Sequence, residues 1–306
     1  MQKTEKIWLD GKLIPWEQAN VHILTHTLHY GVGVFEGIRY YDCGSEGSAV
    51  FRLRDHMKRF LESAKSVAMN VPYDLNKLCE ACVETAKANQ LKEGYLRPIA
   101  FISEGPGAGV WAFDNPVRVG VITWGWGKYL GDEGFKNGIK TMISSYTRLH
   151  RNISATKAKV CGQYANSVLA KRDAKVNGCD EALLLDTEGF VAEGTGENLF
   201  LVKDGIVYTP RLGSILPGFT RDVVMKLLKE DGIPFREEQL IRDDVYNADE
   251  IFLTGTAAEI TPVREVDARP VGTGKPGPVT VNMAKQYIEI VHGRVAKYKE
   301  WLTYLR

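Results

Sequence analysis

The chain has 306 residues with 39 basic and 38 acidic side chains, a formal net charge of +1. This balance excludes an overall field that attracts nucleic acid or an anionic membrane, so we expect small-molecule partners, and the length favours two domains. The five scattered cysteines, the absence of a signal-peptide pattern and the absence of a membrane-spanning apolar run predict a soluble, cytoplasmic protein.

Turn signals come first along the chain. Asp10-Gly11, Glu188-Gly189 and Asp204-Gly205 each lie between strand-like runs and predict hairpins. After the first hairpin we expect Asp55 to cap a helix whose apolar residues recur at helical spacing, namely Phe60, Leu61, Ala64, Val67 and Ala68. A second helix is predicted over residues 75–89, after Pro72, and a strand over residues 116–124.

The glycines that follow this strand predict a domain junction, because the segment has few periodic apolar positions. We therefore expect a small N-terminal α/β domain over residues 1–125, a linker over 126–135 and a larger C-terminal α/β domain over 136–306. In the second domain, a strand is predicted over 138–145, helices over 163–177 and 220–231, and a last long helix after a Pro- and Gly-rich loop at 270–278. The predicted class is α/β with mixed sheets.

An acidic, glycine-rich bend lies between two apolar strand-like runs, with the sequence Glu193-Gly194-Thr195-Gly196-Glu197-Asn198. The glycines allow unusual backbone angles and the close approach of a large molecule. Two interpretations of Glu193 stay open: a carboxylate that faces a bound molecule, and a turn residue at the end of a hairpin strand. We interpret Glu197 and Asn198 as structural groups that satisfy backbone donors in the bend.

A lysine, a carboxylate and phosphate-binding loops are the parts that pyridoxal phosphate needs, because this cofactor forms a Schiff base and requires a partner for its pyridine nitrogen. Lys159 lies among small residues, and Tyr164 follows five positions later. Lys157 is the local rival, which spacing does not exclude, and a solvated surface charge is the ordinary interpretation of either lysine taken alone. A carboxylate such as Glu193 can keep the pyridine nitrogen protonated.

Two loops are candidates for the phosphate. The segment from Leu216 to Asp222 enters a predicted helix, whose free amides and dipole suit an anion; an ordinary capped helix is the alternative. The segment from Thr254 to Ala258 offers hydroxyls and amides after the strand-like run 250–253, and a plain strand-to-helix turn is the alternative.

Arg97 is a candidate carboxylate anchor because its guanidinium can bind a carboxylate bidentately, and in an extended segment it shares a face with Tyr95. Half of a structural ion pair is the alternative. Aromatic residues elsewhere are candidates for an apolar pocket or for the core: Tyr30, Phe35, Trp126 and Tyr129.

Two motifs resemble metal sites, but neither is complete. His22, His26 and His29 have helical spacing without the glutamate of a metalloprotease helix, and Cys79 and Cys82 lack a second cysteine pair. We expect no metal ion, and we expect the two cysteines to lie in the core.

Taken together, ordered segments along nearly the whole chain resemble the branched-chain amino acid aminotransferases of pyridoxal-phosphate fold type IV. These segments are the opening hairpin, His29-Tyr30-Gly31, Phe35-Glu36-Gly37-Ile38-Arg39, Tyr95-Leu96-Arg97-Pro98, the Lys159 region, Glu193 to Asn198, Leu216 to Asp222 and Gly255 to Pro262. The resemblance implies a two-domain fold with the active site in the cleft.

The resemblance also implies roles for individual residues. Lys159, rather than Lys157, is the implied Schiff-base lysine, Glu193 the pyridine-nitrogen partner, and Tyr164 the partner of the phenolic oxygen. The other implied cofactor ligands are Arg59, Leu216, Phe219, Thr220 and Thr256. Tyr95, Arg97 and the amides of Thr256, Ala257 and Ala258 are the implied carboxylate ligands, and Phe35, Trp126, Tyr129 and Tyr164 surround the substrate side chain.

The implied reaction is transamination between a branched-chain L-amino acid (leucine, isoleucine or valine) and 2-oxoglutarate. In this family the counterpart of Tyr30 reaches across from the neighbouring subunit, so a homodimer is the minimal unit, and a hexamer built as a trimer of dimers is compatible with it. The alternatives are a D-amino acid or (R)-amine transaminase, an aminodeoxychorismate lyase, and a non-catalytic protein that binds a phosphate ligand.

Overall fold

The structure, a computed structural model, describes residues 3–127 and 131–305 and divides into two compact units. Unit 1 comprises Met1–Gly127, Ala158–Gln163 and Ile290–Arg306, and unit 2 comprises Lys128–Lys157 and Tyr164–Glu289. Two later segments therefore belong to unit 1, although the linear division predicted from the sequence assigns them to the C-terminal domain. They do so because a strand near the C-terminus pairs in the sheet of unit 1 and Val160 bridges to Val34.

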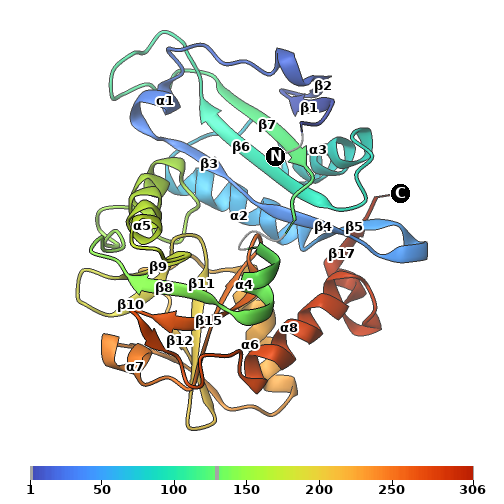
Figure 1. The fold of residues 1–306 in the computed structure, drawn as a ribbon. Coiled ribbons are helices and arrows are strands. Elements are labelled where there is room, and N and C mark those ends of the chain that lie inside the picture. The colour runs from blue at the N-terminus through green and yellow to red at the C-terminus, as the bar shows by residue number, and fades with distance from the viewer. Residues whose placement is uncertain (1–2, 128–130, 306) are drawn as a thin grey trace. The chain divides into compact units, whose positions relative to one another are not determined.

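Unit 1 is built on an eight-stranded antiparallel sheet (Figure 1). The order is β17-β5-β4-β6-β7-β1-β2, with β3 paired to β6. The strands are β1 (Lys6–Leu9), β2 (Lys12–Pro15), β3 (Gly33–Phe35), β4 (Ile38–Asp42), β5 (Ser48–Phe51), β6 (Gly94–Ile102), β7 (Val117–Trp124) and β17 (Leu302–Tyr304). The long β6–β7 ladder pairs Arg97 with Ile122 and Tyr95 with Trp124, so the predicted extended conformation of Tyr95-Leu96-Arg97 is confirmed.

Two long helices and several short ones complete unit 1. Their bounds are η1 (Trp16–Gln18), α1 (His26–Tyr30), η2 (Gly44–Glu46), α2 (Leu53–Ser66), α3 (Leu75–Ala88), η3 (Cys161–Gln163) and η4 (Ala296–Trp301). Helix α3 packs against β1 and β7 (Figure 1). It begins after Pro72, and Asp74 caps it by accepting a hydrogen bond from Lys77 N at 2.8 Å.

The prediction that Asp55 caps the first long helix is wrong by three residues. Helix α2 begins at Leu53, its N-cap residue Arg52 has a left-handed backbone conformation, and Asp55 lies in the first turn, where it pairs with the Arg52 side chain. The helix also ends before Val67. Its buried face consists of Leu53, Met57, Phe60 and Ala64, so apolar packing rather than the acidic residue determines where the helix starts.

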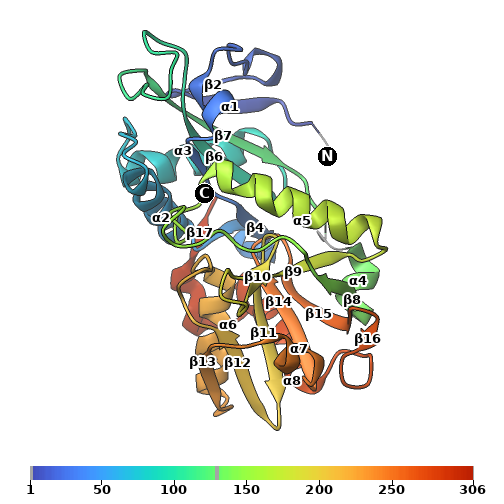
Figure 2. The same ribbon diagram turned by 90° about the vertical axis from the view of Figure 1, so that its left-hand side faces the viewer.

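Unit 2 contains a nine-stranded mixed sheet (Figure 2). The order is β10-β9-β8-β15-β14-β11-β12-β13, with β16 paired to β15. The strands are β8 (Ile139–Ile143), β9 (Glu181–Leu185), β10 (Val191–Gly194), β11 (Asn198–Lys203), β12 (Ile206–Pro210), β13 (Phe235–Glu238), β14 (Glu250–Gly255), β15 (Glu259–Val266) and β16 (Arg269–Pro270). Parallel pairs involving β8 and β12 combine with antiparallel hairpins, which confirms the predicted mixed α/β class.

The helices of this part of the chain are α4 (Gly131–Asn137), α5 (Tyr164–Val176), α6 (Phe219–Glu230), α7 (Arg242–Tyr246) and α8 (Pro278–Val291). Helix α5 packs on β9 through Ala170 and Ala174, and α6 packs on β14. A cluster of buried aliphatic side chains that includes Leu199, Leu253 and Val263 forms the main core of the sheet. These bounds match the helices predicted over 163–177 and 220–231 to within one residue at each end.

The three predicted hairpins are confirmed. Asp10 and Gly11 have φ of 48° and 93°, and Asp204 and Gly205 have φ of 50° and 75°, as the tight connections between β1 and β2 and between β11 and β12 require. Gly189, at φ 89°, lies in the longer connection between β9 and β10. Among the residues that the structure describes, no helix combines the length and the apolar character needed to traverse a bilayer.

Candidate functional site

Lys159 lies in unit 1 beside strand β3. Its backbone carbonyl accepts a hydrogen bond from Phe35 N at 3.1 Å, and its backbone N–H donates to Ser63 Oγ at 3.0 Å. The side chain is half-buried and places Nζ 4.9 Å from the centroid of the Phe35 ring. Lys157 is exposed. The environments of the two rival lysines therefore differ, and only Lys159 has the aromatic contact.

Close contact between two glycines holds the Lys159 segment against α1. Gly162 N donates to Gly31 O at 2.9 Å, and a Cβ added to Gly31 would lie 2.9 Å from Gly162 Cα. Gly31 also ends α1 with a φ of 73°, a conformation that favours glycine. The short stretch His29-Tyr30-Gly31 thus supports the segment that carries the lysine.

Arg97 lies among aromatic rings of unit 1. The centre of its guanidinium group is 4.8 Å from the Phe35 centroid, 5.4 Å from that of Tyr95 and 5.6 Å from that of Trp124. Its Nε is buried without a hydrogen-bond partner. Among the residues that the structure describes, Arg97 has no carboxylate partner, so the alternative of a structural ion pair does not apply. A cation with an unsatisfied donor suits an anionic ligand.

Tyr95 and Trp126 extend this aromatic group. Their rings meet edge to face with centroids 4.7 Å apart and planes at 84°. Tyr95 is buried against the backbone at Gly37, where an added Cβ would lie 1.7 Å from the tyrosine Oη. Lys159, Phe35, Arg97, Tyr95 and Trp126 are therefore brought together within unit 1. Tyr129 lies outside the described residues.

Arg59, predicted as a phosphate ligand, belongs to a buried ionic group in unit 1. Its Nε and Nη2 donate to Glu36 Oε1 and Oε2 at 2.7 and 2.9 Å, and His56 Nδ1 lies 2.7 Å from Glu36 Oε2. Burial acts to raise the pKa of Glu36, but Arg59 and His56 outweigh it and hold that pKa well below its usual range. This bidentate pair fixes the plane of the guanidinium, a group whose chemistry suits a phosphate.

Glu193 lies on β10 in unit 2 and is nearly buried, with 7% of its surface exposed. Arg148 Nε donates to Glu193 Oε1 at 2.7 Å. Asn198 Nδ2 and the backbone N–H of Leu216 both donate to Oε2 at 3.1 Å. The carboxylate is thus held in a defined orientation by a charge and two neutral donors, which an ordinary turn glutamate does not require.

Asn198 departs from its predicted role. Its side-chain amide donates to the Glu193 carboxylate and, at 2.9 Å, to the carbonyl of Leu216, so it links β10 to the loop that leads into α6. It does not cap backbone donors within the bend. Glu197 does so, because its Oε2 accepts from Gly196 N at 3.1 Å.

Glu197 belongs to a second buried group of unit 2. Burial and the nearby carboxylate of Glu181 raise the pKa of Glu197 to about 8. Glu181 in turn accepts a hydrogen bond from Thr195 Oγ1 at 2.7 Å and pairs with Lys171. The bend that follows Glu193 is therefore fixed by buried side chains rather than exposed to solvent.

The N-terminus of α6 fits a phosphate group. The helix begins at Phe219 after Gly218, and no side chain caps it. The helix is therefore not the ordinary helix with a side-chain cap that was the alternative. A phosphate is a suitable acceptor for the backbone amides of such a terminus. Thr220 is buried in this turn, and the neighbouring Leu216 amide is already bound to Glu193. Leu216 therefore contributes to the candidate site through its hydrogen bond to Glu193.

The second candidate phosphate loop joins two antiparallel strands rather than a strand and a helix. Thr256, Ala257 and Ala258 form the turn between β14 and β15, where Gly255 pairs with Glu259. The turn lies against the bend after Glu193, since an added Cβ on Gly255 would be 3.4 Å from Gly196 O. Thr254 Oγ1 is buried without a hydrogen-bond partner. Tyr164 is half-buried at the first position of α5.

The histidines of the first motif bind backbone groups. His26 Nε2 lies 3.2 Å from Gly109 O, His29 Nε2 lies 2.8 Å from Ile23 O, and His22 Nδ1 accepts from Leu24 N. Among the described residues, no group of three or more His, Cys, Asp or Glu side chains is arranged to hold a metal ion. All five cysteines are free thiols.

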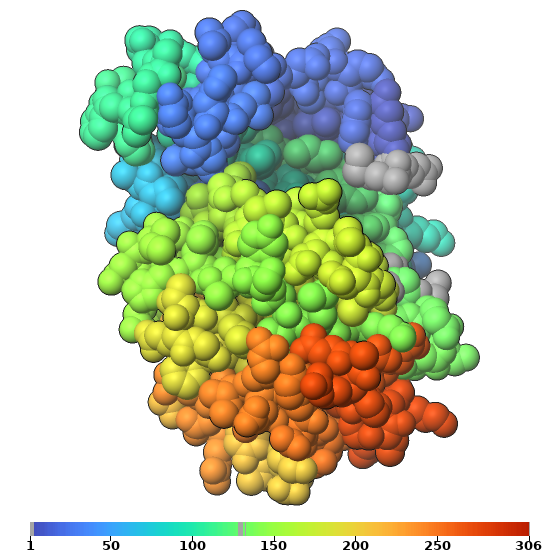
Figure 3. Space-filling view, turned by 60° about the vertical axis from the view of Figure 1, so that its left-hand side comes forward, coloured from blue at the N-terminus to red at the C-terminus, as the bar shows by residue number. Residues whose placement is uncertain are grey.

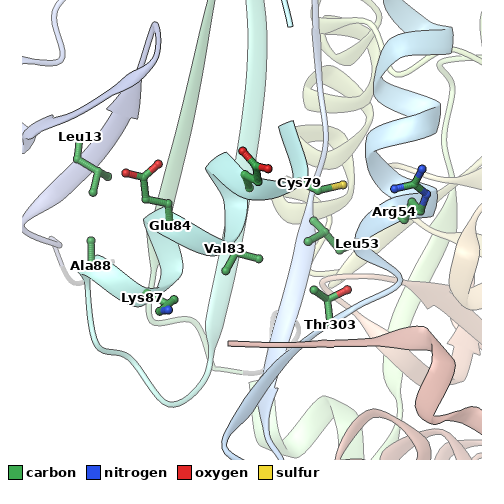
Figure 4. Close-up of a pocket in the computed structure, with 10 residues that line it drawn as sticks. Leu13, Leu53, Arg54, Cys79, Val83, Glu84, Lys87, Ala88 and Thr303 are labelled. Carbon is green, nitrogen blue, oxygen red and sulfur yellow. The ribbon is translucent and has the colours of Figure 1, made fainter. Parts of the chain in front are cut away.

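A depression of unit 1, about 730 Å³ in volume, contains none of the predicted site residues (Figure 4). Helix α3 supplies much of its wall, including Cys79, Val83 and Lys87, and β17 contributes Thr303. Of the two cysteines predicted for the core, Cys82 is buried, but Cys79 is only half-buried and lines this depression. Burial raises the pKa of both thiols, which makes them poor nucleophiles.

Sequence reasoning missed three site residues. Arg148, Glu36 and His56 were not identified because their partners lie 45, 23 and 20 positions away along the chain, and no local pattern marks them. The only available signal is that a buried carboxylate requires a cationic or donor partner.

Comparisons with known proteins place this arrangement in context. Residues 33–266 match the family described as amino-transferase class IV. A branched-chain-amino-acid aminotransferase of Pseudomonas aeruginosa is 47% identical over 300 residues, which cover 98% of this chain and 97% of that protein. The enzyme of the same name from Escherichia coli is 43% identical over 307 residues, with the same two coverages.

Solved structures resemble the fold over the whole chain. A branched-chain amino acid aminotransferase solved with pyridoxamine 5'-phosphate has a TM-score of 0.94 and 44% identity and covers 100% of both chains. The Escherichia coli branched-chain amino acid aminotransferase has a TM-score of 0.95 and 43% identity and covers 99% of this chain and 100% of its own. The branched-chain aminotransferase of Thermoproteus uzoniensis, solved with norvaline, has a TM-score of 0.94 and 42% identity, with the same two coverages.

Proposed function

The chain belongs to the class IV aminotransferases, and from this membership we propose that it transfers amino groups between branched-chain L-amino acids and 2-oxoglutarate. Enzymes of this class use pyridoxal 5'-phosphate as cofactor. The products of the proposed reaction are a branched-chain 2-oxo acid and L-glutamate. The observation that carries the proposal is that Lys159 Nζ and Arg97 lie 4.9 and 4.8 Å from the same Phe35 ring.

This observation matters because an amino acid presents an amine and a carboxylate on one carbon. Lys159 supplies a reactive amine and Arg97 a cation with an unsatisfied donor, and Phe35 is an apolar surface that both contact. When bound, pyridoxal phosphate takes up the amino group and withdraws electrons from the substrate α-carbon. Lys159 then acts as general base and acid that moves a proton at that carbon.

The remaining cofactor contacts follow from the chemistry of each group. Glu193 is the partner of the ring nitrogen, and Tyr164 is the partner of the phenolic oxygen. The phosphate is assigned to the N-terminus of α6 at Phe219 and Thr220, together with Thr256 and the Arg59 guanidinium.

One pocket serves both apolar and acidic substrates in this proposal. The rings of Phe35, Tyr95 and Trp126 accept a branched side chain, while Arg97 accepts the side-chain carboxylate of glutamate. The backbone amides at Thr256, Ala257 and Ala258 and the Tyr95 hydroxyl hold the other carboxylate.

The two neighbouring lysines provide the test of the proposal. Purified protein is expected to be yellow, and borohydride should remove the colour and attach the cofactor to the peptide that contains Lys159. Lys159→Ala should lose multiple-turnover transamination, while the matched control Lys157→Ala, at an exposed side chain, should retain it. Ordinary turnover by Lys159→Ala would overturn the assignment.

A steady-state comparison of substrates tests the amino acid class. We expect leucine, isoleucine and valine to be converted with 2-oxoglutarate far faster than D-alanine or an (R)-amine. Faster conversion of either of the last two, or release of pyruvate from aminodeoxychorismate, would favour another enzyme of fold type IV.

We also propose a homodimer located in the cytoplasm, for which the five free thiols are suited. Unit 1 exposes apolar side chains on two adjoining segments, among them Ile23 at 73%, Leu28 at 60%, Val110 at 79% and Trp111 at 73%. His26 and Tyr30 contact the carbonyls of Gly109 and Ala108, which joins the two segments into one surface (Figure 3). Exposed apolar surface of this kind is typical of protein interfaces.

Tyr30 is 44% exposed on this surface and is the residue that would complete the partner's substrate pocket. Trp111→Glu should convert the dimer to a monomer in sedimentation experiments and reduce turnover with it, because charged groups are excluded from the core of an interface. Dissociation of a hexamer to dimers rather than monomers would instead place this surface between dimers and overturn its assignment to the dimer interface.

A further inference from the structure

Arg148 and Glu193 form a close, buried charged contact in unit 2. Nε of the arginine lies 2.7 Å from Oε1 of the glutamate, and each residue has 7% of its surface exposed. Ion pairs withdrawn from water in this way are energetically significant, unlike those on the surface. Among the residues that the structure describes, Arg148 has no second carboxylate partner, so its charge is directed to Glu193 alone.

The sheet determines this contact. Glu193 pairs with Leu184 in the β9–β10 ladder, and the backbone N–H of Arg148 donates to the carbonyl of the next residue on β9, Leu185, at 2.7 Å. The backbone of Arg148 is therefore fixed at the end of β9, the strand that pairs with β10, and β10 carries Glu193. The contact depends on backbone hydrogen bonds and not only on two side-chain rotamers.

Other charged groups near Glu193 do not offset this arginine. Glu197 is close enough for the two carboxyl groups to influence each other, but burial and Glu181 raise the pKa of Glu197 to about 8, so it is largely neutral at pH 7. Two further donors to Glu193, the Asn198 amide and the Leu216 N–H, are uncharged. Lys171 is paired with Glu181.

We propose that Arg148 is a positioning residue that keeps Glu193 ionised, so that the proton shared between Glu193 and the cofactor stays on the cofactor's ring nitrogen. The inference rests on the proposed role of Glu193. A hydrogen bond between a carboxylate and a pyridine nitrogen can hold its proton at either end. A guanidinium paired with the carboxylate favours the anion and would therefore favour the protonated nitrogen, the form in which the ring withdraws electrons best.

The proposal distinguishes the charge of Arg148 from its hydrogen bond. Arg148→Gln keeps a donor but removes the charge, Arg148→Lys keeps the charge, and the matched control is Arg151→Gln. Arg151 lies three residues later, is 62% exposed and pairs only loosely, at 3.6 Å, with the exposed Glu188.

The main readout is the ¹⁵N chemical shift of cofactor labelled at its ring nitrogen and bound to each protein at one pH. Wild type, Arg148→Lys and Arg151→Gln should give the shift of a protonated pyridine. Arg148→Gln should move at least half of the way to the shift of neutral pyridine. An unchanged shift in Arg148→Gln would overturn the proposal.

Glu193→Gln separates this failure from failure of the proposed function. If that variant keeps the protonated shift, Glu193 is not the ring-nitrogen partner and the assignment on which the inference rests is wrong. If it loses the protonated shift while Arg148→Gln keeps it, only the role of Arg148 fails.

A second measurement needs no cofactor and no turnover. In apoprotein labelled with ¹³C at the glutamate carboxyl carbon, the signal that disappears in Glu193→Gln is titrated with acid. Its midpoint should rise by one pH unit or more, a tenfold change in the acid dissociation constant, in Arg148→Gln but not in Arg151→Gln. If Arg148→Gln does not fold, Arg148→Met, which also removes the charge, gives the same test, and an unchanged midpoint there contradicts the proposal.

Discussion

Gly218 provides the space that the side chain of Asn198 occupies. A Cβ added at position 218 would lie 2.1 Å from Asn198 Oδ1, so only glycine allows the asparagine to reach both Glu193 and the Leu216 carbonyl. The same glycine is the N-cap residue of α6. Gly218 therefore contributes both to the orientation of the Glu193 carboxylate and to the candidate phosphate site at the start of α6.

Replacing Gly218 with alanine should displace Asn198 and release one donor from Glu193. Loss of a hydrogen bond to a charged group costs about 1.5 to 3 kcal/mol, which corresponds to roughly 10-fold to 150-fold weaker binding of pyridoxal phosphate to the apoprotein. Gly213→Ala is the control, because an added Cβ there meets no atom within 4 Å. Equal affinities of the two variants would show that Asn198 is not needed to orient Glu193.

Gly37→Ala should act on the substrate and not on the cofactor. The new methyl group would overlap the Tyr95 hydroxyl, and overpacking of this kind costs about 1 to 3 kcal/mol. We expect KM for leucine to rise about tenfold, with cofactor affinity unchanged. Gly125→Ala, where an added Cβ meets nothing within 4 Å, should leave KM as it is. A Gly37→Ala enzyme with normal KM would exclude Tyr95 from substrate binding.

Arg97→Leu should separate the two half-reactions. Glutamate loses a charged hydrogen-bonding partner for its side chain, which costs about 1.5 to 3 kcal/mol for each bond, so kcat/KM should fall roughly 10-fold to 150-fold. Leucine as amino donor should lose less. Arg118→Leu, which removes a partly exposed arginine paired with Asp10, is the control. Equal losses for glutamate and leucine would contradict the dual role of Arg97.

Glu36→Gln should strongly destabilise unit 1. The change leaves the buried Arg59 guanidinium without its counter-charge, and breaking a buried pair in this way costs about 3 to 5 kcal/mol. Glu80→Gln removes one partner of an exposed pair with Lys77 and should cost less than about 1 kcal/mol. Denaturant unfolding of the two variants checks the contrast. Similar midpoints would mean that the Glu36 group contributes no more than a surface pair.

Glu197 should make stability fall as the pH rises. Its pKa is about 8 in the folded protein against a usual value of 4.5, so its stabilising effect is complete below pH 4.5 and is lost as the pH rises through 8. The slope in this window is at most about 1.4 kcal/mol per pH unit, the value for one bound proton.

Glu197→Gln should flatten this dependence, because the amide cannot release a proton. Thermal unfolding between pH 5 and pH 9, roughly the window that the linkage defines, checks the expectation, with the exposed Glu188→Gln as control. If the unfolding temperature of Glu197→Gln keeps the wild-type dependence on pH, another group is responsible for it.

Much of the fold could be predicted from sequence because it depends on local chemistry. The turn pairs Asp10-Gly11 and Asp204-Gly205 adopt the positive φ values that their residue types permit, and α3 begins where Asp74 caps it. The beginning of α2 was not predictable in this way, because burial of Leu53 overrides the capping signal of Asp55.

The residues of the candidate site show the same difference between what local sequence indicates and what packing decides. Residue types and their order indicated Lys159, Glu193 and Arg97, and resemblance to a family selected Lys159 over Lys157. In the structure Lys159 lies against Phe35 and Lys157 is exposed. The interpretation of Asn198 as a turn residue was wrong, because the nearby loop before α6, and not the bend itself, supplies one of its two partners.

By itself, the sequence determined the classes of secondary structure, the turn positions and the chemical groups available to the site. Tertiary structure alone decided which charges are neutralised and by which partner: Glu193 by Arg148 across 45 positions, and Glu36 by Arg59 across 23. The physical reason is that strand register and loop closure bring distant residues together, and a buried charge then selects whichever partner that geometry supplies.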